Sequence, residues 1–360
     1  MWTDARFAGG DKLYVSAPRD AYMRVPDIIL KCVVFLGQDT EHGRRYKGTG
    51  YVVINYRPEK SFLFLLTAAH VAEELDGFDF YIRANHRDGR VVELTQKCEQ
   101  SLWWYHPTER ESVDAAAMMI PFTEIMELDL QPIPVPMFIS EATIKSKNIG
   151  VGDEVFVAGL FTNAKGTSKQ SPIIRIGNVA MMPEEKIFFP TDDKPDQWLY
   201  ADLLESRSIG GLSGSPVFIR ETVRIDTSSH SGGRMRIATA REESGEPTEI
   251  AGVGRFHFFG SMVGHWQIPL PAEFSRTQLE AVNMGIAPMV PAHKILEILT
   301  QPELSDMMEK LVHAAKERRK QEDGVAKLDS ASTPKEHPLT KEGFEDALKK
   351  ASRKIMPDKK

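Results

Sequence analysis

The feature that most constrains the fold is a succession of short apolar runs, rich in β-branched residues and separated by turn residues. The first run is 28–36, and turn chemistry such as Arg87-Asp88-Gly89 separates later ones. The other predicted strands are 51–54, 61–66, 78–82, 91–95, 154–158, 173–176, 198–200, 216–219 and 256–263. Many short strands with few helices between them predict an all-β fold, either a sandwich or barrels.

Three segments differ from this pattern. Residues 1–26 show no periodicity and are expected to form an irregular lead-in, and the polar stretch 221–248 is expected to be a surface insertion. Residues 301–360 are expected to form a charged helical tail with a polar linker at 321–338. The last predicted helix carries Phe344 and Ile355 on one face. We expect it either to pack on its own domain or to bind a protein partner or a second copy of the chain.

Composition excludes several classes of function. The net charge of −6 argues against nucleic-acid binding. The apolar runs are shorter than the roughly 20 residues of a membrane span, and the N-terminus lacks a signal-peptide pattern. We therefore expect a cytoplasmic protein without membrane contact, in which Cys32 and Cys98 are free thiols. No metal-binding or phosphate-binding motif is present, so no cofactor is expected.

Three short segments carry residues of catalytic type. His70 follows an apolar run in Thr-Ala-Ala-His-Val, and Asp114 opens another apolar run. Ser213 lies in the glycine-rich turn Gly-Gly-Leu-Ser-Gly-Ser-Pro-Val. A serine hydroxyl needs a neighbouring base to become a nucleophile, and an imidazole oriented by a carboxylate is such a base. Ser215 is the competing nucleophile, but the glycine–serine–glycine turn centres on Ser213.

At these segments the chain resembles the chymotrypsin-like (trypsin-like) serine peptidases, whose chain order is also His, Asp, Ser. The closest likeness is to bacterial members: 48–53 and 152–157 are similar to HtrA-type proteases, and 211–218 is similar to glutamyl endopeptidases. Segment 285–291 resembles the last strand of the family. The resemblance covers roughly 27–300 and implies two antiparallel Greek-key β-barrels, at about 27–140 and 141–300, followed by the helical extension.

The resemblance also implies roles for individual residues. Ser213 would be the nucleophile, His70 the general base and acid, and Asp114 the orienting carboxylate. The backbone N–H groups of Gly211 and Ser213 would form the oxyanion hole. The implied substrate-binding residues are Arg207, Ser208, Met262, Val263 and Gly264.

Two departures from the family narrow these expectations. Leu212 stands where digestive members carry the Asp that pairs with a new N-terminus, so activation by that ion pair is not expected. Arg207 occupies the pocket-base position and would favour an acidic group if it points inward. The sequence thus predicts a serine endopeptidase that cleaves polypeptides through an acyl-enzyme. The alternative is a catalytically silent or latent peptide-binding module on the same fold.

Overall fold

The structure is a computed structural model of the 360-residue chain. It describes residues 25–41, 43–57, 60–100, 102–121, 125–161, 166, 168–191, 194–206, 212–221, 256–264, 267–269, 281–283 and 285–331. The chain divides into two compact units, Met1–Met308 and Glu309–Lys360. The expected lead-in at 1–26, the insertion at 221–248 and the tail after 331 lie almost wholly outside the described residues, so the expectations for them stay predictions.

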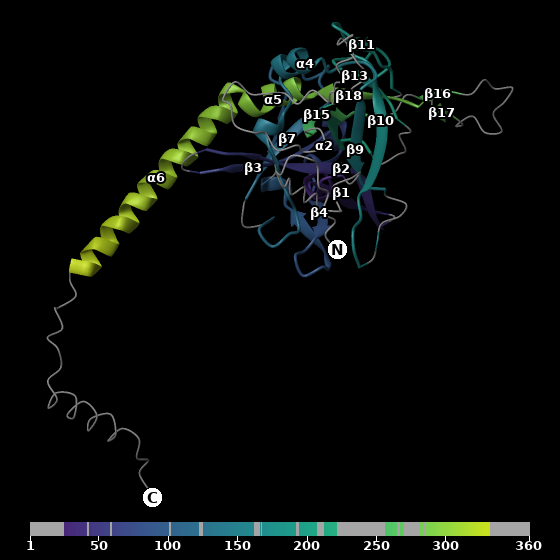
Figure 1. The fold of residues 1–360 in the computed structure, drawn as a ribbon. Coiled ribbons are helices and arrows are strands. Elements are labelled where there is room, and N and C mark those ends of the chain that lie inside the picture. The colour runs from purple at the N-terminus through teal and green to yellow at the C-terminus, as the bar shows by residue number, and fades with distance from the viewer. Residues whose placement is uncertain are drawn as a thin grey trace, which may run out of the picture. The chain divides into compact units, whose positions relative to one another are not determined.

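The first half of the larger unit forms one eight-stranded sheet (Figure 1). Its strands are β1 (Val33–Thr40), β2 (Gly43–Asn55), β3 (Phe62–Thr67), β4 (Phe80–Asn85), β5 (Val91–Gln96), β6 (Trp103–Tyr105), β7 (Ala116–Ile120) and β8 (Ile133–Pro134). The order is β5-β4-β1-β2-β3-β7-β6, all antiparallel, and β8 pairs with β2 in parallel. The run β4-β1-β2-β3 is a Greek key, because the fourth strand returns to lie beside the first.

The second half forms a closed six-stranded barrel. Its strands are β9 (Glu154–Gly159), β10 (Ile173–Met181), β13 (Asp202–Glu205), β14 (Pro216–Arg220), β15 (Phe256–Met262) and β18 (Ile286–Pro291). The short pairs β11 (Ile187–Phe188) with β12 (Trp198–Leu199) and β16 (Gln267–Pro269) with β17 (Ala281–Asn283) lie outside the barrel. Strand β14 returns to pair with β9 as β4 returns to β1, so both halves follow the same Greek-key order. Within the described residues, only the second half closes.

Strand β3 shows how burial builds the first core. Every residue from Phe62 to Thr67 is buried, which explains the unbroken apolar run in the sequence. Leu63 and Leu65 face a core that also contains Phe80 and Trp103, whose rings stack 5.9 Å apart. Packing on both faces therefore fixes the position of β3, and with it the position of the residues that follow Thr67.

The first predicted strand, 28–36, is wrong at its start. Residues Asp27–Lys31 form the helix α1, and β1 begins only at Val33. Pro26 precedes the helix with φ −56°. Asp27 lies in the first turn, where its negative charge interacts favourably with the helix dipole. Ile29 is buried, so burial of one side chain stabilises this short helix despite its β-branched sequence.

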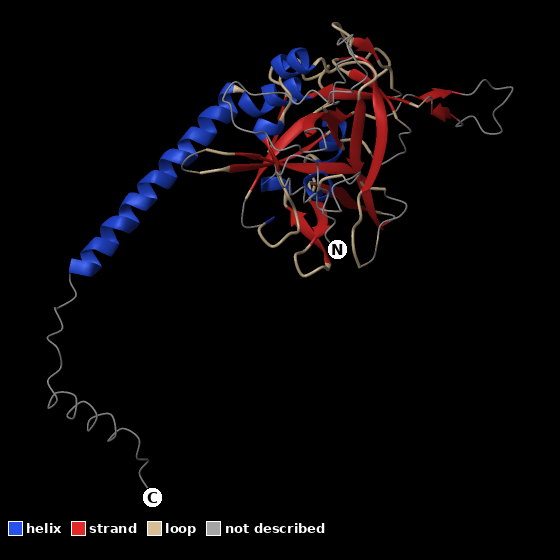
Figure 2. Cartoon of the chain, viewed as in Figure 1, coloured by secondary structure: helices blue, strands red, loops and turns tan. Residues whose placement is uncertain are grey.

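Figure 2 shows that helices are few among the strands of the larger unit. Those in the described residues are α1, α2 (Ala69–Leu75), α4 (Glu141–Lys147) and α5 (Ala292–Thr300), with 3-10 turns at Cys98–Gln100 and Val135–Met137. Helix α6 (Pro302–Ala331) begins in the larger unit and continues into the second. Helix α5 packs on β15, β18 and β7 and so contacts both halves. Helix α6 continues past residue 320, where the polar linker was expected to start. The prediction of an all-β, Greek-key fold with a helical C-terminal extension is confirmed.

Both cysteines are free thiols, as expected; Cys32 is buried and Cys98 is exposed. None of the helices in the described part of the chain combines the length and apolar character that a membrane crossing requires.

Candidate active site

His70 is positioned by the junction of β3 and α2. Strand β3 ends at Thr67, Ala68 caps the helix, and α2 begins at Ala69. His70 therefore lies in the first turn of a helix that is anchored by a fully buried strand. Its side chain is 42% exposed, so the imidazole is accessible from solvent although its backbone is fixed.

Asp114 lies in the buried segment that precedes β7 and binds His70 twice. Its Oδ2 is 2.8 Å from Nδ1 of His70, and its Oδ1 accepts a hydrogen bond of 3.0 Å from the backbone N–H of His70. A carboxylate only accepts, so the proton in the 2.8 Å bond belongs to Nδ1. Nε2 is then the unprotonated nitrogen of a neutral His70, which is the arrangement that a general base requires.

The two groups shift each other's pKa in opposite directions. Burial works to lower the pKa of His70, but the charge and hydrogen bond of Asp114 outweigh it and raise that pKa above the ordinary histidine value. Burial works to raise the pKa of Asp114, but the charge and the two hydrogen bonds of His70 hold that pKa below its usual value. Asp114 therefore stays ionised near neutral pH and stabilises the imidazolium form of His70.

The turn that carries Ser213 is held by backbone hydrogen bonds from both halves. The Thr49 N–H donates to the Ser213 carbonyl at 3.0 Å, which ties the turn to β2. The Gly214 N–H donates to the Met262 carbonyl at 2.8 Å, and the Met262 N–H donates to the Ser215 carbonyl at 2.9 Å. Ser213 thus lies where the first sheet and the second barrel meet.

Gly214 brings this turn against the backbone before His70. Its φ is +78°, a conformation that favours glycine. A Cβ at this position would overlap Thr49 O and Thr67 Oγ1 and would lie 2.8 Å from the backbone nitrogen of Ala68. Ala68 is two residues before His70, so the packing of Gly214 places the serine turn beside the histidine segment.

The structure brings the three predicted triad residues into one region, but it does not complete the chain of hydrogen bonds. Among the described residues, the Ser213 hydroxyl makes no hydrogen bond to His70. Ser213 is partly exposed, so its side chain has room to rotate. Catalytic hydrogen bonds are often long in the absence of substrate and tighten when it binds.

The predicted substrate-binding residues fall into two groups. Arg207 and Ser208 lie outside the described residues, as does Gly211 of the predicted oxyanion hole, so the roles of these residues stay predictions. The other three are described: Met262 and Val263 are buried, whereas Gly264 is partly exposed, with open space where a Cβ would stand.

The backbone of Met262 is already used by the serine turn, through both its N–H and its carbonyl. The Val263 N–H donates to the Pro288 carbonyl at 3.0 Å. Of the three, Gly264 is therefore the most accessible residue.

Sequence reasoning missed two linked threonines, of which Thr49 joins the first half to the second. The Thr67 hydroxyl donates to the Thr49 carbonyl at 2.9 Å, and the Thr49 hydroxyl accepts from the Leu160 N–H at 3.3 Å. Both threonines are buried. For Thr67, its place at the end of an apolar run was the available signal, because a buried hydroxyl requires a partner.

Sequence reasoning also missed the contacts that support the Asp114 segment. The Tyr200 N–H donates to the Ser112 carbonyl at 2.8 Å, and the Ser112 N–H donates to the Glu109 carbonyl at 2.9 Å. Lys294 Nζ in turn donates to the Glu109 carboxylate at 2.9 Å. No local pattern connects these residues, since they come from three distant parts of the chain.

No protein-family model and no curated protein sequence matches this chain. Among solved structures, the chain is similar to the active form of the Rv3671c protease from M. tuberculosis, with 14% identity, a TM-score of 0.40, and coverage of 79% of this chain and 94% of that one. The inactive form gives 14% identity, a TM-score of 0.37, and coverage of 75% and 88%. At this level of similarity we infer function only from the side chains of the chain itself.

Proposed function

We propose that the protein is a serine endopeptidase that uses His70, Asp114 and Ser213. The observation that carries this proposal is the pair of hydrogen bonds that His70 donates to Asp114, beside a serine turn packed on the same segment. A buried aspartate that binds both Nδ1 and the backbone of one histidine fixes the ring and its tautomer together. The likeness of the sequence to bacterial chymotrypsin-like peptidases supports a polypeptide substrate.

The proposed reaction has two stages. His70 Nε2 takes the proton of Ser213 Oγ as this oxygen attacks the carbonyl carbon of the scissile bond. The imidazolium, stabilised by Asp114, then protonates the leaving amine and leaves an acyl group on Ser213. In the second stage His70 removes a proton from water as the water oxygen attacks the acyl carbon. The imidazolium then returns this proton to Ser213 Oγ as the bond between Oγ and the acyl carbon breaks, which releases the carboxylic acid and regenerates the hydroxyl. The N–H groups of Gly211 and Ser213 would bind the oxyanion. Removal of one such donor typically lowers kcat by about 10²–10³-fold.

Covalent labelling by a fluorophosphonate tests this proposal. We expect wild type to be labelled and Ser213→Ala and His70→Ala to lose the label. Ser215→Ala is the matched control, since Ser215 is a neighbouring serine with a fully buried side chain. We expect this variant to keep its label. Retained labelling of a folded Ser213→Ala protein would contradict the assignment of the nucleophile.

The labelling rate should also depend on pH in a way that reports His70. Because the base must be neutral and Asp114 raises the pKa of His70 above its ordinary value of 6.5, activity should fall as pH drops through that raised pKa. A pH profile of the labelling rate constant measures the midpoint. If the labelling rate fell with a midpoint below pH 6.5, this would argue against His70 as the base.

One observation favours a second candidate, a latent enzyme or peptide-binding module. In the described residues, Ser213 does not donate to His70. If folded wild type takes no label but binds unstructured polypeptide, this second candidate is correct. If the folded wild-type protein is labelled without any added activator, the site is active without a further signal.

We further propose a cytoplasmic location and a preference for an acidic residue before the scissile bond, the latter through Arg207. Paired fluorogenic substrates that differ only in glutamate or lysine at that position test the preference. Faster cleavage of the glutamate substrate, lost in Arg207→Gln, would support it.

A further inference from the structure

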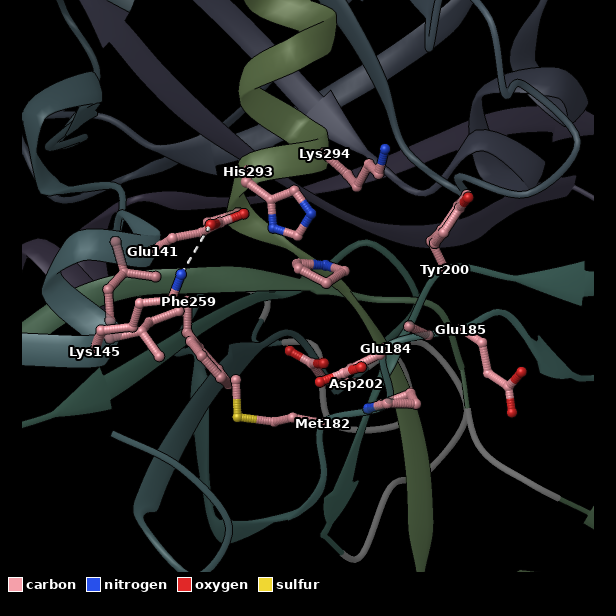
Figure 3. Close-up of a pocket in the computed structure, with 16 residues that line it drawn as sticks. Glu141, Lys145, Met182, Glu184, Glu185, Tyr200, Asp202, Phe259, His293 and Lys294 are labelled. Atoms are coloured by element: carbon pink, nitrogen blue, oxygen red, sulfur yellow. Dashed lines mark ion pairs between the residues drawn. The ribbon is translucent and has the colours of Figure 1, made fainter. Parts of the chain in front are cut away.

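A second site lies at the end of the barrel, where β13, β15 and β18 approach α4 and α5. It is a cavity of about 410 Å³, within the usual range of small-molecule sites. Figure 3 shows His293 and Lys294 of α5 on one side, with Asp202 and Met182 across from them. None of the proposed triad residues lines it.

Asp202 is the unusual residue of this cavity. It is the first residue of β13, and alternation places its side chain on the same face as Leu204, toward the barrel interior. Only 7% of Asp202 is exposed. Within the described part of the chain no hydrogen bond or ion pair reaches its carboxyl group, whereas the equally buried Asp114 receives two.

A buried carboxylate without a partner is unfavourable. Burial alone raises the pKa of Asp202 to about 7, so the group is partly ionised at neutral pH. A cation placed in the cavity would supply the missing partner and stabilise the ionised form.

The other charged groups that face the cavity do not supply this partner. Lys294 Nζ is bound to Glu109 at 2.9 Å and to Glu297 at 3.3 Å, and Lys145 Nζ is 3.8 Å from Glu141. Burial, with the nearby charge of Lys294, lowers the pKa of His293, so its ring is neutral near pH 7. Among the described residues, the lining groups that titrate are Glu141, Lys145, Glu184, Glu185, Tyr200, Asp202, His293 and Lys294.

The described lining thus contains four carboxyl groups and two lysines, and both lysines already form ion pairs with glutamates. The floor beside Asp202 is apolar, with Phe259 buried and Met182 half-buried. The described residues contain no group of three or more potential ligands that could hold a metal ion. The lining of the cavity therefore suits a ligand that has one cationic hydrogen-bond donor attached to an apolar hydrocarbon group.

We propose that this cavity binds a small organic ammonium ion, whose N–H groups donate to Asp202 and whose hydrocarbon part packs on Phe259 and Met182. The occupant would also contact Tyr200 and Lys294, which line the cavity. These two residues hold the segment that leads to Asp114, through Ser112 and Glu109. The site is therefore connected to the proposed active site through direct contacts.

Titration of the full chain with benzylammonium at about pH 8, followed by calorimetry, tests the proposal. We expect saturable binding to wild type. Benzyl alcohol, which has the same shape without the charge, should bind at least about tenfold more weakly, because a charge-assisted hydrogen bond is lost. Asp202→Asn should weaken benzylammonium binding by a similar factor. Glu205→Gln is the matched control, since Glu205 is exposed on the same strand and does not line the cavity.

Two further measurements keep the result interpretable. Asp202→Asn should melt several degrees higher than wild type at about pH 8 without ligand, because the unpaired charge is gone, and this establishes that the variant folds. Benzylammonium binding to wild type should weaken as pH falls below 7, while the variant shows no such change. No saturable binding, equal binding of benzyl alcohol, or unchanged binding to Asp202→Asn would each overturn the proposal.

Discussion

Replacing Asp114 by asparagine is expected to slow fluorophosphonate labelling by about 10⁴-fold near pH 7 while the chain stays folded. The reason lies in the two bonds to His70. The backbone N–H of His70 requires an acceptor, so it donates to the amide oxygen of the new asparagine side chain. The NH₂ group of that side chain then faces Nδ1 of His70. That NH₂ donates to Nδ1, moves the ring proton to Nε2, and removes the nitrogen that would accept the proton of Ser213.

The matched control is Asp76→Asn, the same chemical change at an exposed position at the end of the same helix. It should label at the wild-type rate. Nitrogen-15 spectra of the imidazole add a readout independent of activity: His70 should carry its proton on Nδ1 in wild type and on Nε2 in Asp114→Asn. A variant that labels within about tenfold of wild type would show that Asp114 does not set the tautomer.

The second large effect concerns stability. Gly214→Ala should lower the free energy of unfolding by at least about 3 kcal/mol and abolish labelling. Two costs combine at this position: a side chain at φ +78° is strained, and its Cβ meets Thr49 O, Thr67 Oγ1 and the Ala68 nitrogen. Backbone atoms of two packed strands cannot move aside without breaking the hydrogen bonds that hold the serine turn.

Gly77 separates these two costs. Its φ is +76°, almost the same as at Gly214, but nothing lies within 4 Å of its Cβ position. Gly77→Ala should therefore lose only about 1 kcal/mol, the cost of backbone strain. Urea unfolding of both variants measures the difference. Equal losses would mean that the close approach of Gly214 to the histidine segment contributes nothing.

The candidate site was predictable from sequence to the extent that its parts are local. His70 follows an apolar run, Asp114 precedes one and Ser213 lies in a glycine turn, and such patterns are visible within ten residues. The glycine after Ser213 is required because the turn needs a positive φ, a constraint that acts on one residue. The partners of these residues were not predictable, because Tyr200 reaches Ser112 and Lys294 reaches Glu109 only after the chain has folded.

The sequence by itself determined the all-β class, the positions of most strands and the three segments that carry His70, Asp114 and Ser213, because runs of buried residues and turn glycines act over short distances. The tertiary structure alone decided that Asp27–Lys31 forms a helix, which buries Ile29. It also decided that Asp202 lines a cavity in which no other described residue bonds its carboxyl group. The burial of a side chain and the groups opposite it depend on contacts between distant segments, and no local periodicity specifies those contacts.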